Sequence, residues 1–185
     1  MFKYIWFILL CMLLMAACQN GDVPDTRFSK LHTIVVVKPL PSICTIDDVY
    51  PFMQQFLDAF NSGDQEKLRE IFKSTYVLFS VKERYLGQTE FKMFYTRHYD
   101  DLMIYFEERH ANNEILVLSM FDGSYSEYRK TFEYRFEVVR SADDLPIPND
   151  AYLYSGKGNM SCAEGKILVW SMGIDQTMEQ QIGGG

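Results

Sequence analysis

Thiols and imidazoles are the side chains of this 185-residue chain that are best suited to chemistry. The cysteines and histidines are Cys11, Cys18, Cys44, Cys162, His32, His98 and His110. The spacing of the histidines fits no metal site. The motifs HExxH, CxxC and GxSxG, which mark zinc proteases, thioredoxins and hydrolases, do not occur in the sequence. We therefore expect no bound metal and no cofactor, and we consider each of these side chains in its own surroundings.

Cys18 ends an apolar leader of the kind that directs export. An unbroken apolar run extends from Tyr4 to Cys18, which is shorter than the about 20 residues of a membrane-spanning helix. Ala16 and Ala17 supply the small residues that a signal peptidase needs. A cysteine directly after them resembles the lipobox of bacterial lipoproteins, in which that thiol is diacylated and becomes the new N-terminus. The alternatives are an uncleaved anchor and ordinary secretion.

The leader predicts where the rest of the chain works. We expect residues 1–17 to be a lipoprotein signal peptide and Cys18 to be the lipid attachment site. The domain would then lie in the cell envelope, outside the cytoplasm and lipid-anchored to a bacterial membrane. Residues 18–44 would form the lipidated tether, in which the β-branched residues near 34–37 could form an edge strand.

The location also bears on the two remaining cysteines. An even number of thiols in an exported protein favours a disulfide, here between Cys44 and Cys162. The alternative is two unrelated buried thiols.

Charge and length limit the class of partner. Cleavage after residue 17 removes one lysine and no acid, so the formal net charge changes from −7 to −8. An acidic protein of this kind is a poor match for nucleic acid. The mature length suits a single domain. The 14 phenylalanines and 12 tyrosines suit a sheet-rich core or an aromatic-lined cavity.

Helical patterns fill the first half of the domain. A helix is predicted from about Thr45, because apolar residues recur there at three- and four-residue spacing. Its buried stripe comprises Val49, Phe52, Met53, Phe56, Leu57 and Phe60. Pro51 should lie in its first turn, Gly63 should end it, and Asp64 should cap a second, shorter helix. A strand over residues 76–81 should follow, and then a third helix after Gly87.

The second half reads as strands separated by turns. The predicted strands cover residues 102–109, 114–121, 128–140, 152–162 and 166–172, with a turn at Asp122-Gly123. On the strand over 128–140, Phe132, Tyr134, Phe136 and Val138 should face the core. Helices followed by antiparallel strands predict an α+β fold, with the helices on one face of a curved sheet.

These segments carry a family resemblance. The sequences over residues 52–72, 87–95 and 156–170 resemble the opening helix pair, the third helix and the closing hairpin of the SnoaL-like, or nuclear transport factor two-like, superfamily. The resemblance covers roughly residues 45–173. It implies a cone-shaped domain over residues 45–175, in which three N-terminal helices pack on a strongly curved antiparallel sheet with a pocket at the open end. Residues 176–185 would be a flexible tail.

His98 is the weak candidate for a catalytic residue. It continues the stripe of Phe91, Phe94 and Tyr95 on the predicted third helix, so it should point inward, where Tyr105 or a nearby aspartate could orient it. The alternative is a structural histidine that donates to a backbone carbonyl. No residue of the chain matches a catalytic position of the isomerase or dehydratase branches of the superfamily.

Three functions fit the sequence. The first is an envelope lipoprotein whose cone binds a small apolar ligand or an envelope partner without catalysis. The second is an isomerase-like or dehydratase-like enzyme that uses a histidine or carboxylate in the pocket. The third is a structural or assembly module that uses the exposed face of the sheet.

Overall fold

The computed structural model describes residues 40–147 and 150–177. The predicted signal peptide, Cys18 and the edge strand of the tether lie outside the described residues, as does most of the predicted tail. Within the described part of the chain, no helix is long and apolar enough to cross a membrane.

The first two helices follow the local sequence closely. Helix α2 (Ile46–Ser62) begins after Thr45, whose backbone N–H donates to the side chain of Asp48 over 2.9 Å. It ends at Gly63, which adopts a left-handed conformation with φ of 68°. Asp64 then caps helix α3 (Gln65–Ile71) by accepting from the backbone of Lys67 over 3.0 Å. The predicted caps at Gly63 and Asp64 are confirmed, and the predicted stripe of α2 is buried.

Pro51 does not lie where it was expected. It occupies the second turn of α2 rather than the first, because the caps at Thr45 set the start of the helix. The ring nitrogen of Pro51 has no hydrogen to donate to the carbonyl of Asp47. The helix tolerates this loss because its apolar stripe is held in the core.

The third helix was predicted too early in the chain. Residues that we assigned to it form strand β2 (Lys92–Thr96), and helix α4 (Tyr99–Ala111) covers the residues predicted as a strand. Alternation on β2 leaves Met93 and Tyr95 exposed while Phe94 packs partly into the core. Strand β1 (Leu78–Arg84) pairs with β2 along its length, and this long-range pairing outweighs the weak helical spacing of the segment.

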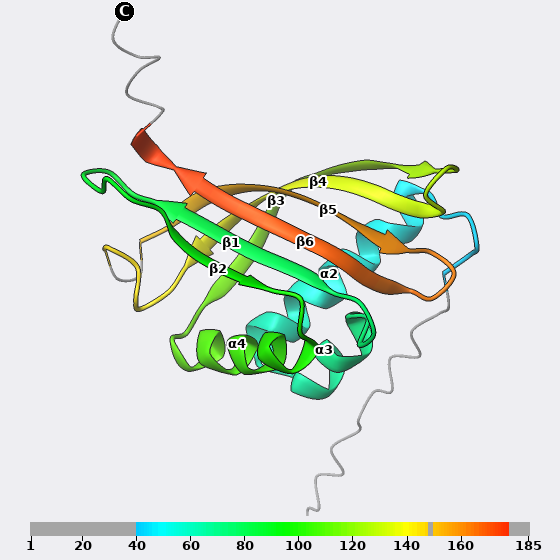
Figure 1. Ribbon diagram of the computed structural model, residues 1–185, viewed down its shortest axis with the longest axis horizontal. Coiled ribbons are helices and arrows are strands. Elements are labelled where there is room, and N and C mark those ends of the chain that lie inside the picture. The colour runs from blue at the N-terminus through cyan, green and yellow to red at the C-terminus, as the bar shows by residue number, and fades with distance from the viewer. Residues whose placement is uncertain (1–39, 148–149, 178–185) are drawn as a thin grey trace, which may run out of the picture. The chain divides into compact units, whose positions relative to one another are not determined.

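The sheet has six strands in the order β2-β1-β6-β5-β4-β3. The remaining strands are β3 (Ile115–Ser126), β4 (Thr131–Ser141), β5 (Tyr152–Ser161) and β6 (Lys166–Asp175). All neighbours pair antiparallel except β1 and β6, which are parallel. The sheet is therefore mixed, which corrects the prediction of a purely antiparallel one. The helices lie on one face of the curved sheet, as Figure 1 shows, so the predicted α+β class is confirmed.

Strand β3 runs through the residues that we predicted as a turn. Asp122 and Gly123 pair with Arg135 and Tyr134 on β4, and the chain reverses only after Ser126. The strand needs glycine at position 123, because a Cβ there would overlap the ring of Phe132 and the backbone of Glu133. Its hydrogen side chain thus marks close packing rather than a turn.

Aromatic side chains from the sheet and from α2 form the centre of the core. Trp170 on β6 is fully buried, with its ring 3.9 Å from that of Phe136 and 4.8 Å from that of Phe56. The predicted inward row of β4 is buried as expected. Gly156 lies opposite Phe136 and leaves space for its ring. These rings belong to the one core cluster that the described strands and helices share.

Candidate functional site

Two adjoining pockets open where β1 and β2 face helix α4. Each has a volume of about 250 Å³, and both are lined by Glu83, Lys92 and Arg140. The first pocket continues between β2 and α4, and the second continues toward the loop after β4. The further lining residues are Val81, Met93, Phe94, Tyr105, Glu108 and Arg109 in the first, and Tyr85, Gln88, Asp144, Leu145 and Pro146 in the second.

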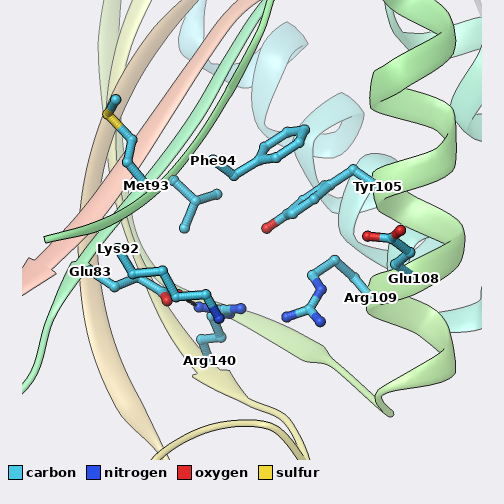
Figure 2. Close-up of a pocket in the computed structure, with 9 residues that line it drawn as sticks. Glu83, Lys92, Met93, Phe94, Tyr105, Glu108, Arg109 and Arg140 are labelled. Atoms are coloured by element: carbon cyan, nitrogen blue, oxygen red, sulfur yellow. Dashed lines mark hydrogen bonds and ion pairs between the residues drawn. The ribbon is translucent and has the colours of Figure 1, made fainter.

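The strand register and the helix period bring the lining residues together. Glu83 on β1 lies directly opposite Lys92 on β2, so both side chains stand on the same face of the sheet. On α4, Tyr105 and Arg109 are four residues apart and share the face that looks toward the strands. Figure 2 shows these side chains converging on the cavity, whereas Met93 points away across the strand.

The wall of the first pocket is aromatic. The ring of Phe94 stacks on that of Tyr105 with a centroid distance of 3.9 Å and an angle of 14° between their planes. Val81 lies opposite Phe94 in the strand register. Tyr105 is 8% exposed, and burial raises the pKa of its phenol. This wall therefore offers a neutral, largely apolar surface.

Behind the pockets lies a chain of paired charges, of which Glu83, Glu114 and Arg140 are buried. Arg140 is 2% exposed and donates to Glu83 and, over 2.7 Å, to Glu114. Arg109 donates to Glu114 over 3.3 Å and binds Asp144 through both nitrogens of its fork, at 3.2 and 2.8 Å. Two arginines thus connect three carboxylates. Buried charges require such pairing because their desolvation is costly.

Two tyrosine hydroxyls extend this network. The hydroxyl of Tyr154 accepts from Arg140 over 2.8 Å and donates to Glu83 Oε1 over 3.0 Å. It also shares a hydrogen bond with the hydroxyl of Tyr85. Burial raises the pKa of both phenols, so they remain neutral donors at any physiological pH.

Burial shifts the titration of Glu114. Its side chain is 1% exposed, and desolvation raises its pKa to about 8 although the charge of Arg109 lowers it. One of its oxygens, Oε1, is buried without a hydrogen-bond partner among the described residues. Asp144 behaves differently, because partial burial raises its pKa but the hydrogen bonds and charge of Arg109 outweigh this and lower it overall.

Glu83 and Lys92 retain atoms that face the pockets. Arg140 and Tyr154 both bind Oε1 of Glu83, and within the described part of the chain nothing engages Oε2. The side chain of Lys92 is exposed, and among the same residues its ammonium makes no hydrogen bond or ion pair. A base and a cation are therefore both open to a ligand.

The structure places His98 away from these pockets. It is the exposed residue that precedes helix α4, and its side chain makes no cap hydrogen bond. The expectation that it points inward is wrong, because it depended on the helix that the structure replaces with β2. Of the proposed orienting residues, Tyr105 lines the first pocket, whereas Asp101 accepts from Thr96 over 3.4 Å.

The cysteines are joined in the structure. Cys44, directly before helix α2, forms a disulfide with Cys162 at the end of β5, with Cα atoms 5.7 Å apart. Both are buried in the core, so the bridge ties the segment before α2 to the end of β5. Cys18 lies outside the described residues. In the described part of the chain, no group of histidine, cysteine and acidic side chains could hold a metal ion.

Sequence reasoning missed the residues that line the pockets. A signal for Arg140 was present, because it continues the inward alternation of Phe132, Tyr134, Phe136 and Val138 on β4. Glu83 likewise follows Phe79 and Val81 on the buried face of β1. A charged residue in register with a buried row indicates a functional position or a buried ion pair. Glu114 and Asp144 lie at loop ends, where no periodicity could identify them.

Comparisons with known proteins concern the fold. The chain matches no protein-family model and no characterised protein sequence. A protein of unknown function with a cystatin-like fold from Methylobium petroleophilum PM1 is similar in structure, with a TM-score of 0.53 and 9% identity over 70% of this chain and 77% of that chain. Naphthalene 1,2-dioxygenase gives a TM-score of 0.55 and 12% identity over 70% and 78% of the two chains.

A third similar structure is the NTF2-like (nuclear transport factor two-like) protein of unknown function from Cytophaga hutchinsonii. It is 12% identical over 74% of this chain and 95% of that chain, with a TM-score of 0.46. At these identities the likeness extends to the fold and no further. The domain is an α+β cone of three helices and a six-stranded sheet, as the family resemblance predicts, except that the sheet is mixed rather than antiparallel.

Proposed function

We propose that this chain is a lipid-anchored protein of the bacterial cell envelope whose domain binds a small molecule in the two pockets beside Lys92. The anchor follows from the leader and Cys18. The observation that carries the binding function is a pair of pockets with an aromatic wall on one side and charged groups on the other. Ligand sites combine apolar lining with a few fixed polar groups in this way.

The pockets also refine the expected ligand. The sequence predicted a small apolar molecule, but charged side chains are shared by both pockets. A wholly apolar ligand would remove water from these charges without replacing its hydrogen bonds, which is costly. We therefore expect a small ligand with one apolar part and one polar part. An envelope protein with a protruding side chain of that type is the alternative partner.

Native mass spectrometry of the full chain, purified from its host's envelope, tests this function. We expect a small molecule to copurify with the wild type, and its amount to fall at least tenfold in Phe94→Ala, which removes part of the aromatic wall. Phe91→Ala is the matched control, because Phe91 lies just before the same strand and outside both pockets. Equal loss from both variants, or no bound molecule in the wild type, would contradict the proposal.

One observation favours an enzyme as the second candidate. Glu83 lines both pockets, and its Oε2 has no hydrogen-bond partner within the described residues, while Tyr154 and Arg140 hold the other oxygen. A fixed carboxylate of this kind can remove a proton from a bound substrate. Wild-type protein in D2O would then introduce deuterium into the copurifying molecule, and Glu83→Gln would not. Absence of exchange in the wild type would leave binding as the function.

The exposed face of the sheet offers a surface for the assembly alternative. Val117, Val139 and Leu153 are neighbours across β3, β4 and β5, and Val117 and Leu153 are 56% and 51% exposed. Analytical ultracentrifugation of the wild type and of Leu153→Lys tests it. A dimer that dissociates in the variant supports assembly through this face, and a monomer in both excludes it.

A further inference from the structure

We propose that the ligand of these pockets is a small amphipathic carboxylate, which pairs with Lys92 through its carboxylate and lies against Phe94 and Tyr105 with its apolar body. This inference rests on the proposed binding function, because it names the chemical class of the ligand for the same pockets. Three features of the site support it: the open cation, the pairing of the neighbouring acids, and the different lining of the two pockets.

Lys92 is a cation placed to bind an anion. It borders both pockets and stands opposite Glu83 in the strand register. Glu83 does not pair with it, because Arg140 and Tyr154 already bind the carboxylate of Glu83. The lysine ammonium therefore keeps all three of its donors for a ligand or for water. A carboxylate is the matching partner, since hydrogen bonds between two charged groups are the strongest kind.

The acids around Lys92 are balanced by other groups. Arg140 neutralises Glu83, and Arg109 binds Asp144 through two hydrogen bonds. Glu114 lies behind them, where burial raises its pKa and both arginines donate to it. Lys92 makes no hydrogen bond or ion pair with any of these acids within the described residues, and its charge acts on Glu114 and Asp144 only at longer range. Glu108, an exposed acid of α4, also borders the first pocket.

The position of Glu108 indicates where the carboxylate of the ligand lies. Each pocket has one acid of its own, Glu108 in the first and Asp144 in the second. Arg109 binds Asp144 through two hydrogen bonds, whereas the side chain of Glu108 has no hydrogen bond or ion pair among the described residues, so the second pocket offers an anion less repulsion. In the second pocket the side-chain carbonyl of Gln88 accepts from the backbone of Tyr85 over 3.2 Å. This hydrogen bond leaves the amide NH2 of Gln88 as a further donor. Lys92 and Gln88 together supply the donors that a carboxylate needs.

The first pocket suits the other end of the same molecule. Its wall of Val81, Phe94 and Tyr105 is apolar, and the two pockets share three lining residues. A ligand whose carboxylate lies by Gln88 and whose body extends past Lys92 would occupy both. Figure 2 shows Lys92 on one side of this path and the stacked rings of Phe94 and Tyr105 on the other.

The test compares a carboxylate with its neutral analogue of the same shape. Binding of 4-phenylbutanoate and 4-phenylbutanamide to the full chain is measured by isothermal titration calorimetry at pH 7. We expect the wild type to bind the carboxylate about tenfold more tightly than the amide. Lys92→Met should remove this preference while leaving the affinity for the amide unchanged. Lys82→Met, an exposed change on β1 next to Glu83 and outside these two pockets, should keep the preference.

The outcomes separate the inference from the function on which it rests. If both probes bind equally well, or if Lys92→Met retains the preference, the pockets bind a ligand but the carboxylate assignment is wrong. If neither probe binds and no molecule copurifies with the chain, the binding function fails and the inference fails with it. Circular dichroism of the three proteins shows that each variant is folded.

Discussion

The guanidinium of Arg140 donates to the carboxylate of Glu114 over 2.7 Å, and neither side chain is more than 2% exposed. Arg140 belongs to β4 and Glu114 directly precedes β3. Arg140 also binds Glu83 on β1, and strands β5 and β6 lie between β4 and β1 in the sheet. One buried cation therefore holds elements together behind the pockets, and removing it should affect both stability and the shape of the site.

The first prediction concerns Arg140 itself. Arg140→Met would leave Glu83 without its cation and Glu114 with only Arg109, and both acids would remain buried. We expect the free energy of unfolding to fall by about 3–5 kcal/mol, as is found when one partner of a buried pair is removed. Urea unfolding with the disulfide intact measures this loss. Arg135→Met, an exposed change on the same strand, should cost less than about 0.5 kcal/mol.

The second prediction follows from the titration of Glu114. Its pKa is raised from 4.5 to about 8, so the folded state holds a proton that the unfolded state loses above pH 4.5. The stability from this proton is complete below pH 4.5 and is lost as the pH rises through about 8, at a slope of at most about 1.4 kcal/mol per pH unit. Glu114→Gln cannot ionise and should lack this slope.

Unfolding at pH 5 and at pH 8 measures that difference. Relative to the wild type, Glu114→Gln should gain stability as the pH rises between these values. A constant difference between the two proteins at both values would show that Glu114 ionises at its ordinary pKa. Glu108→Gln, an exposed change on α4, provides the control for the effect of removing a carboxylate.

The third prediction concerns the disulfide between Cys44 and Cys162. The two residues are 118 positions apart, and the chain-entropy model gives about 5 kcal/mol of stabilisation for a loop of that length. Replacing both cysteines by alanine should lower the free energy of unfolding by about this amount. Reducing agent should destabilise the wild type and leave the double variant unchanged. Equal sensitivity of the two proteins to reducing agent would argue against the bridge.

The fourth prediction concerns the anchor. Cys18→Ala removes the thiol that lipidation requires, so the protein should move from the membrane fraction to the soluble fraction of the envelope. Cell fractionation followed by immunoblotting measures the distribution. Cys11→Ala is the matched control, because Cys11 lies within the predicted signal peptide and its loss should not change the fraction. Retention of Cys18→Ala in the membrane would mean that the leader remains as an uncleaved anchor.

Local signals predicted the elements that depend on neighbours in sequence. The caps of α2 and α3, at Thr45, Gly63 and Asp64, form hydrogen bonds or backbone conformations within a few residues. The inward row of β4 depends only on alternation. The prediction for residues 87–109 was wrong because the structure of this segment depends on residues that are distant in the sequence. The spacing of its aromatic residues fits both a helix and a strand. Pairing with β1 and packing in the core determine that residues 92–96 form a strand.

The sequence by itself therefore determined the α+β class, the first helix pair and the closing hairpin. Only the tertiary structure decided the site. Its charged residues come from three strands and a helix, namely Glu83, Lys92, Arg140 and Arg109. Glu114, in the loop before β3, accepts hydrogen bonds from both arginines. Their charges interact through space, and burial sets the pKa of Glu114. Neither distance nor burial is a property of residue order, because both arise only when the sheet and α4 come together.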